Sequence, residues 1–126
     1  MFTLSNITEQ QLRVISEALD LYSRVLTGQL NEVPNVLRKK LALYNQNEQS
    51  RDDINQAIST IKRYMFPNIH PYVAYSIGSP DTNIDAKRAY EIYKVIDIYM
   101  HPFASVNQGA TVRHLTDESV MEISEV

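Results

Sequence analysis

Residues 8–28, TEQQLRVISEALDLYSRVLTG, decide the fold, because they predict a long amphipathic helix that must pack against other elements. Thr8 and Gln11 form a capping box, in which each side chain accepts a hydrogen bond from the other residue's backbone amide. A helix is therefore expected to begin near Glu9 and to end at Gly28 through a left-handed cap. Its apolar residues cover nearly half of the circumference, more than a surface helix requires. We expect it to pack against two neighbours, or against one neighbour and a second copy of the chain.

Periodic apolar residues predict three further helices, separated by polar or proline-containing segments. Residues 45–53 carry no apolar side chain and are expected to form an exposed loop. Residues 68–83 contain two prolines and a glycine, which favour an extended connector that lies across the helices. The three helices are expected at residues 36–44, from the capping residues Asp52 or Asp53 to the stop at Pro67, and at residues 84–100.

The end of the chain differs in character from the rest. Residues 110–115 and 119–126 are rich in β-branched residues and alternate in part, so they predict a hairpin that could pair with residues 2–4. The acidic end is equally compatible with disorder. The predicted fold is mainly α, of the α+β class: about four helices in a compact bundle, with a small antiparallel β element made by the N-terminal and C-terminal segments. We expect a helical core domain at residues 1–102 and a tail at residues 103–126.

Length and composition exclude several classes of protein. A chain of 126 residues fits one hydrophobic core and is too short for two cores with a cleft between them. Its net charge of −3 gives no general attraction to DNA or RNA, and no run reaches the roughly 18 apolar residues that cross a membrane. The chain has no cysteine and begins without a secretion signal. We therefore expect a cytoplasmic protein without disulfides.

No catalytic, metal-binding or cofactor motif stands out. The three histidines are widely spaced, and two of them precede proline, a pattern that does not suit a zinc site. The three glycines lie far apart, whereas phosphate-binding loops need several of them together. Ser76 and Gly78 match only part of a nucleophile elbow, because the first glycine of that motif is absent. The sequence predicts neither an enzyme nor a bound metal or cofactor.

Arg88 departs from this plain pattern. On a helical wheel it shares an arc with apolar residues such as Ile84 and Val95, so a permanent charge points toward apolar surroundings and requires a partner. Asp85, three residues earlier, is one candidate partner. The other is an anionic ligand, because Arg88 lies in the first turn of its helix, where free backbone amides also favour anions.

Arg24 and the tyrosines admit two interpretations each. Arg24 lies on the polar face of the first helix, four residues after Asp20, so periodicity indicates a solvated ion pair. Tyrosine rings suit both a core and an adaptive binding surface, because they combine a large apolar area with a hydroxyl group. Tyr90, on the polar side of its helix, and Tyr72 or Tyr75 in the connector are the better candidates for ligand stacking or subunit contact.

The chain resembles a group of small proteins of unassigned function encoded by bacteriophages and prophages. The resemblance rests on ALDLYSRVLTGQL (residues 18–30), YSIGSP (residues 75–80) and AKRAYEIYKVI (residues 86–96), and it does not extend to the tail. It implies a non-catalytic anti-defence protein that sequesters a nucleotide-derived immune second messenger in an oligomeric, sponge-like assembly in the host cytoplasm. A pocket of that kind needs rings for bases, cations for phosphates and small polar groups for sugar hydroxyls. The residues that offer these groups are Arg24, Gln29, Tyr75, Ser76, Lys87, Arg88 and Tyr90.

The sequence leaves other functions open. A protein-protein inhibitor or adaptor that occludes a host defence or polymerase protein would use the wide apolar arc and the acidic tail as its surface. A scaffold role in the virion and an enzyme with an unfamiliar phosphodiesterase or hydrolase site are further alternatives. For the leading hypothesis the expected partners are a nucleotide-derived small molecule and further copies of the chain, with no DNA, RNA or membrane.

Overall fold

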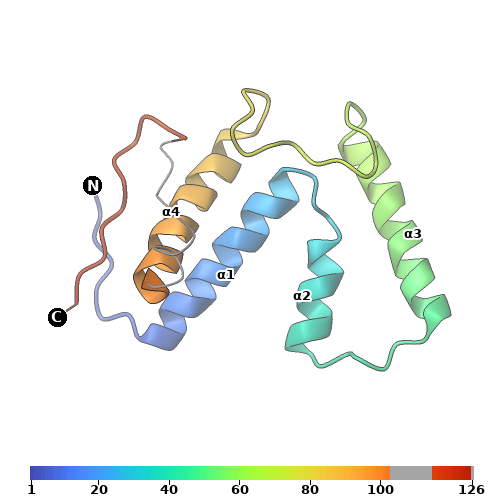
Figure 1. Ribbon diagram of the computed structural model, residues 1–126, viewed down its shortest axis with the longest axis horizontal. Coiled ribbons are helices and arrows are strands. Elements are labelled where there is room, and N and C mark those ends of the chain that lie inside the picture. Colours follow the sequence, from blue (N-terminus) through green and yellow to red (C-terminus); the bar gives the residue numbers. More distant parts are fainter. Residues whose placement is uncertain (103–114, 126) are drawn as a thin grey trace.

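A computed structural model describes residues 1–102 and 115–125 of the chain. The described residues form four α-helices and no strand, so the prediction of a mainly helical protein with four helices is confirmed. Figure 1 shows their arrangement. The helices are α1 (Glu9–Leu26), α2 (Glu32–Lys40), α3 (Glu48–Met65) and α4 (Ile84–Met100).

The pairing of α1 with α4 is the centre of the fold (Figure 1). Ala86, Ala89 and Ile96 are buried on α4, and the two alanines let the helix backbones approach closely. The Ser23 hydroxyl on α1 donates a hydrogen bond of 3.0 Å to the Ala86 carbonyl oxygen, so a buried polar group of the interface has a partner. The α1–α4 contact therefore combines small side chains with one fixed hydrogen bond.

Each end of α1 follows the predicted chemistry. The capping box of Thr8 and Gln11 is present in full, with hydrogen bonds of 2.9 and 3.1 Å. Gly28 has a φ of 95°, which a residue with a side chain rarely adopts. A Cβ atom at this position would lie 3.1 Å from Cδ1 of Ile69, so glycine also lets the connector pass close to the helix end.

Helix α3 begins at Glu48, before the expected caps Asp52 or Asp53, so the prediction of a loop over residues 45–53 is wrong for residues 48–53. The Asn47 side chain accepts a hydrogen bond of 2.8 Å from the Ser50 amide and caps the helix. A polar first turn carries no apolar periodicity, so the sequence pattern does not predict this start of the helix.

The other end of α3 contacts the connector. The Lys62 ammonium on α3 donates to the Val73 carbonyl oxygen of the connector at 2.5 Å.

The four helices do not form one compact bundle. Helix α2 packs against α1, and the Lys40 ammonium lies 2.6 Å from the Glu17 carboxylate, but α3 has few contacts with the other helices. In Figure 1 it lies at the far end of the molecule from α4. The apolar stripe of α3 is therefore left largely without a partner among residues 1–102 and 115–125.

The small β element is not present in the described residues, and that prediction is wrong as far as they reach. Residues 2–4 are exposed and pair with no strand, and residues 119–125 form no ladder. The preceding tail residues bind side chains of α4 instead, and an isolated pair of short strands is marginal in water. Residues 110–114 of the expected hairpin lie outside the described residues. Across the described parts, no helix is long and apolar enough to cross a membrane.

Candidate functional site

The segments that were expected to form the site lie against one another. The Tyr75 amide donates a hydrogen bond of 2.9 Å to the Thr27 carbonyl oxygen at the end of α1, and Ser23 binds Ala86 on α4. The Thr82 hydroxyl donates to the Ser76 carbonyl oxygen at 2.5 Å, which fixes the turn before α4. Through these contacts the fold brings the end of α1, the connector and the start of α4 into one region.

Arg24 and Gln29 meet in this region, but they bind each other. The Arg24 guanidinium donates to the Gln29 side-chain oxygen at 3.1 Å and to the Asp20 carboxylate at 3.0 Å. The Glu32 carboxylate lies 3.7 Å from the same guanidinium. The hydrogen bond to Asp20 raises the pKa of Arg24. Arg24 therefore holds the end of α1 to the start of α2, and its charge is compensated within the chain.

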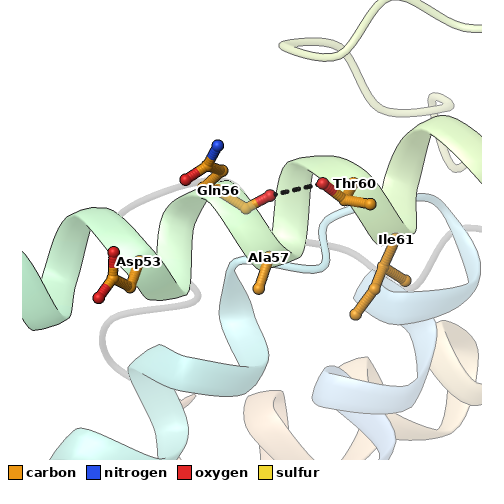
Figure 2. A pocket seen from close by; sticks show the side chains of 5 residues that line it. All are labelled: Asp53, Gln56, Ala57, Thr60 and Ile61. Carbon is orange, nitrogen blue, oxygen red and sulfur yellow. Dashed lines mark hydrogen bonds between the residues drawn. The ribbon is translucent and has the colours of Figure 1, made fainter.

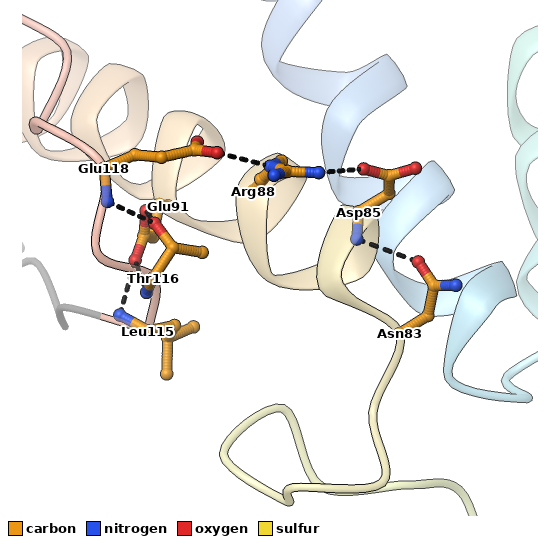
Figure 3. A network of polar contacts seen from close by, with 7 residues as sticks. All are labelled: Asn83, Asp85, Arg88, Glu91, Leu115, Thr116 and Glu118. Atoms are coloured by element: carbon orange, nitrogen blue, oxygen red, sulfur yellow. Dashed lines mark hydrogen bonds and ion pairs between the residues drawn. The ribbon is translucent and has the colours of Figure 1, made fainter.

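Arg88 has its partners within the chain as well (Figure 3). Its guanidinium lies 2.8 Å from the Asp85 carboxylate and 2.7 Å from the Glu118 carboxylate of the tail. Both hydrogen bonds, that to Asp85 first, raise the pKa of Arg88. The apolar arc that was expected to surround this charge is partly open to solvent, since Ile84 is 46% exposed. The sequence-based partnership with Asp85 is present, and Glu118 adds a second carboxylate that local spacing could not reveal.

Glu91 is a buried residue of the site region that sequence reasoning missed. Its carboxylate accepts hydrogen bonds from the Thr116 amide at 2.7 Å and from the Thr116 hydroxyl at 2.8 Å, and also from the Leu115 amide. Figure 3 shows these groups converging on α4 beside Arg88. The sequence around Glu91 gives little signal, because an acid beside Lys87, Arg88 and Lys94 on a helix is typical of a solvated ion pair. Glu91, Arg88 and their tail partners form what we call the tail clasp.

A neighbouring side of α4 carries lysines and tyrosines. The Lys94 ammonium lies 5.8 Å from the centre of the Tyr90 ring and 5.5 Å from that of Tyr93, distances typical of cation–π contacts. The two ring centres are 6.3 Å apart. Lys87 precedes Tyr90 by three residues and Lys94 by seven, so helical geometry places it on the same side. We call Lys87, Tyr90, Tyr93 and Lys94 the lysine-tyrosine surface.

This surface borders the Arg24 region. Burial raises the pKa of Tyr93, the nearby charges of Asp20 and Asp97 raise it further, and Arg24 lowers it. Sequence reasoning named Lys87 and Tyr90 but not Tyr93 or Lys94, although the spacing of three and four residues could have found them. Arg88 lies about 160° around α4 from Tyr90, because a helix turns by about 100° per residue. The fold thus places Lys87 and Tyr90 together and Arg88 on another side.

Two depressions on the surface of the described residues lie away from the expected site. One, of about 430 Å³, is on α3 (Figure 2) and is lined by Asp53, Gln56, Ala57, Thr60 and Ile61. The other, of about 600 Å³, is open and is lined by Ser5, Asn6, Ile7, Gln10, Gln11, Val14 and Ile15. Neither contains a sequence-predicted site residue. Within residues 1–102 and 115–125, histidine and acidic side chains form no cluster that could hold a metal ion.

Comparison of the chain with protein-family models, with curated proteins and with solved structures finds no match.

Proposed function

We propose that the protein acts by binding rather than by catalysis, and that it sequesters a nucleotide-derived signal on the lysine-tyrosine surface. The observation that carries this proposal is the position of Lys94, whose ammonium lies over the rings of both Tyr90 and Tyr93. Rings for stacking and cations for phosphate are the groups that such a ligand requires. Arg24 and Arg88 both form ion pairs with carboxylates of the chain, so we assign phosphate binding to Lys87 and Lys94.

The charges around this surface favour Lys94 as the anion contact. Its ammonium and the Asp97 carboxylate are 4.0 Å apart, the outer limit of an ion pair. A phosphate oxygen can therefore replace Asp97 as the partner of Lys94 at little cost in free energy. Lys87 supplies a second cation on the same side of α4. Arg24 and Gln29 form the border of the surface, where Arg24 stays paired with Asp20 while it holds Gln29 in place.

The biological setting of this proposal comes from the resemblance to phage-encoded proteins. In that setting the chain is an anti-defence protein of the host cytoplasm, the ligand is an immune second messenger, and the protein works as a homo-oligomer. A sponge has to bind its ligand without altering it. The proposal therefore predicts that the messenger is recovered chemically intact.

The test is to incubate the purified protein with a panel of cyclic nucleotides, cyclic dinucleotides and cyclic ADP-ribose variants, and then to heat it and identify what is released. Retention of an intact member of the panel supports the proposal, and release of an altered product refutes it in favour of an enzyme. Lys94→Ala and Tyr90→Ala should each abolish retention, whereas Lys39→Ala, on α2, changes the charge equally and should retain the ligand. Arg88→Ala should also retain it, because Arg88 lies on another side of α4.

A protein-protein inhibitor is the second candidate, and the open depression beside α1 favours it. Ile7, Val14 and Ile15 line this depression, and Val14 is 65% exposed although it lies on the apolar arc of α1. A photo-crosslinking residue at position 14 should then give one discrete adduct in infected cells, and the same residue at Arg13 should give none. Intact retention of a nucleotide without such an adduct would reject this candidate.

A further inference from the structure

Helix α3 is the part of the structure that most needs a partner. Its Ile54, Ala57, Ile58, Ile61 and Met65 recur at intervals of three and four residues and form one apolar stripe, which we call the α3 stripe. In the described structure no member of the stripe is buried, and Lys62 is the one buried residue of the helix. Ile61 is 48% exposed and Met65 is 70% exposed. Figure 2 shows Ala57 and Ile61 projecting from the same side of the helix.

An uncovered helix of this composition is not stable by itself. Helices in water gain most of their stability from packing of an apolar face, and α3 has 18 residues, close to the length at which isolated helices are marginal. The chain exposes 9547 Å² of surface, whereas a folded monomer of 14.5 kDa exposes about 6,900 Å². Part of this excess lies in the exposed residues 1–7 and part on the uncovered face of α3.

The partner that fits this need is a second copy of the chain. A helix that depends on its cover for stability requires that cover whenever the protein is folded, and a second copy is always made together with it. A second apolar row supports the assignment. Val33 and Leu37 of α2 and Leu41, which directly follows the helix, recur at intervals of four residues and are 37%, 48% and 62% exposed. The α3 helix of a second copy can pack against the α3 stripe and against this row.

The charges of α3 determine how two copies would pair. The first turns carry Glu48, Asp52 and Asp53 against a single Arg51, and the last turn carries Arg63 as its exposed cation, because Lys62 is buried against the Val73 carbonyl. An antiparallel pair places each acidic end beside the basic end of the partner, and it also opposes the helix dipoles. A parallel pair would bring like charges together. Two-fold symmetry around the middle of the stripe then sets Ile54 of one copy opposite Met65 of the other.

We propose that the α3 stripe and the exposed row of α2 form a self-association surface, on which two copies of the chain pair through antiparallel α3 helices. The inference deepens the oligomeric part of the proposed function, and it does not use the lysine-tyrosine surface. A dimer that retains no nucleotide would therefore refute the sponge but leave this interface standing. A monomer that retains an intact nucleotide would refute this interface but leave nucleotide binding on the lysine-tyrosine surface standing.

Sedimentation equilibrium of the full chain is the first test, and it should give twice the 14.5 kDa mass of the chain at micromolar concentration. Ile58→Asp should give the monomer mass, whereas Gln56→Asp, on the polar side of the same helix, should leave the dimer intact. A wild-type chain that stays monomeric throughout the micromolar range would overturn the proposal.

Cysteine crosslinking tests the geometry even if Ile58→Asp fails to fold, because the chain has no cysteine of its own. Ile54→Cys and Met65→Cys chains, co-expressed and oxidised, should form a mixed disulfide between two copies. Ile54→Cys alone should not, because two Ile54 positions lie about 16 Å apart along an antiparallel pair, at about 1.5 Å per residue. Absence of the mixed disulfide, or an equal yield from Ile54→Cys alone, would refute the antiparallel interface.

Discussion

Replacement of Glu91 by alanine should release the tail from α4 without unfolding the helices. Glu91 is 7% exposed, and its carboxylate accepts hydrogen bonds from two backbone amides and one hydroxyl of the tail. Hydrogen bonds to a charged group contribute about 1.5–3 kcal/mol each, but the freed tail groups regain water as partners. We therefore expect a loss of about 2–4 kcal/mol in tail docking, well below the sum of three such bonds.

The assay is hydrogen exchange at the Leu115 and Thr116 amides. A loss of 2–4 kcal/mol corresponds to exchange that is roughly 30 to 700 times faster, because about 1.4 kcal/mol changes an equilibrium tenfold. Amides of α1 and α4 should keep their protection, since their pairing does not depend on Glu91. Glu122→Ala, at an exposed position of the tail, is the matched control and should leave exchange unchanged. Unchanged exchange at Thr116 in the Glu91→Ala variant would show that the clasp does not hold the tail.

Three further variants test the fold. Ile96→Ala removes the most completely buried large side chain, 1% exposed, and should lower the free energy of unfolding by about 2–5 kcal/mol in urea titrations. Gly28→Ala should cost about 1–3 kcal/mol by the same measure, because of the φ of 95° and the close Ile69 side chain. Burial raises the pKa of Tyr93 above 10.0, so the folded state holds this proton more tightly than the unfolded state. The contribution of Tyr93 to the free energy of unfolding is complete below pH 10 and is lost as pH rises through the folded pKa. Urea titrations at pH 8–12 should therefore show a smaller alkaline decrease in this free energy for Tyr93→Phe than for the wild type. Alkaline curves that are identical for wild type and Tyr93→Phe would contradict this interpretation.

The sequence predicts the helices best where local chemistry marks both ends. For α4, the observed limits Ile84–Met100 agree with the prediction, because Asn83 caps the first turn and a histidine-proline pair follows the last. The start of α3 is missed because Asn47 begins a polar turn without apolar periodicity. The β element is wrong for another reason. β-branched residues indicate a strand only when a neighbouring strand is available, and here the tail binds α4 instead.

The candidate site is predicted only in part, because its charges are paired over long sequence distances. Local spacing correctly suggests that Asp85 binds Arg88 and that Asp20 binds Arg24. It cannot show that Glu118, thirty residues away, is the second partner of Arg88. Nor can local spacing show that backbone amides of the tail donate hydrogen bonds to the Glu91 carboxylate. These contacts decide which cations remain for a ligand, and they follow from the tertiary fold alone.

Helix α4 links these observations, because its three sides meet three different surroundings. Ala86 and Ile96 face α1, the tail clasp occupies a second side, and the lysine-tyrosine surface adjoins the clasp, because Glu91 lies between Lys87 and Lys94. A helix is stiff enough to keep the three sides in fixed positions relative to one another. Release of the tail by Glu91→Ala should therefore leave ligand retention by Tyr90 and Lys94 unchanged. Loss of retention in that variant, with α1 and α4 still protected from hydrogen exchange, would show that the tail contributes to the binding site and that a site confined to one side of α4 is wrong.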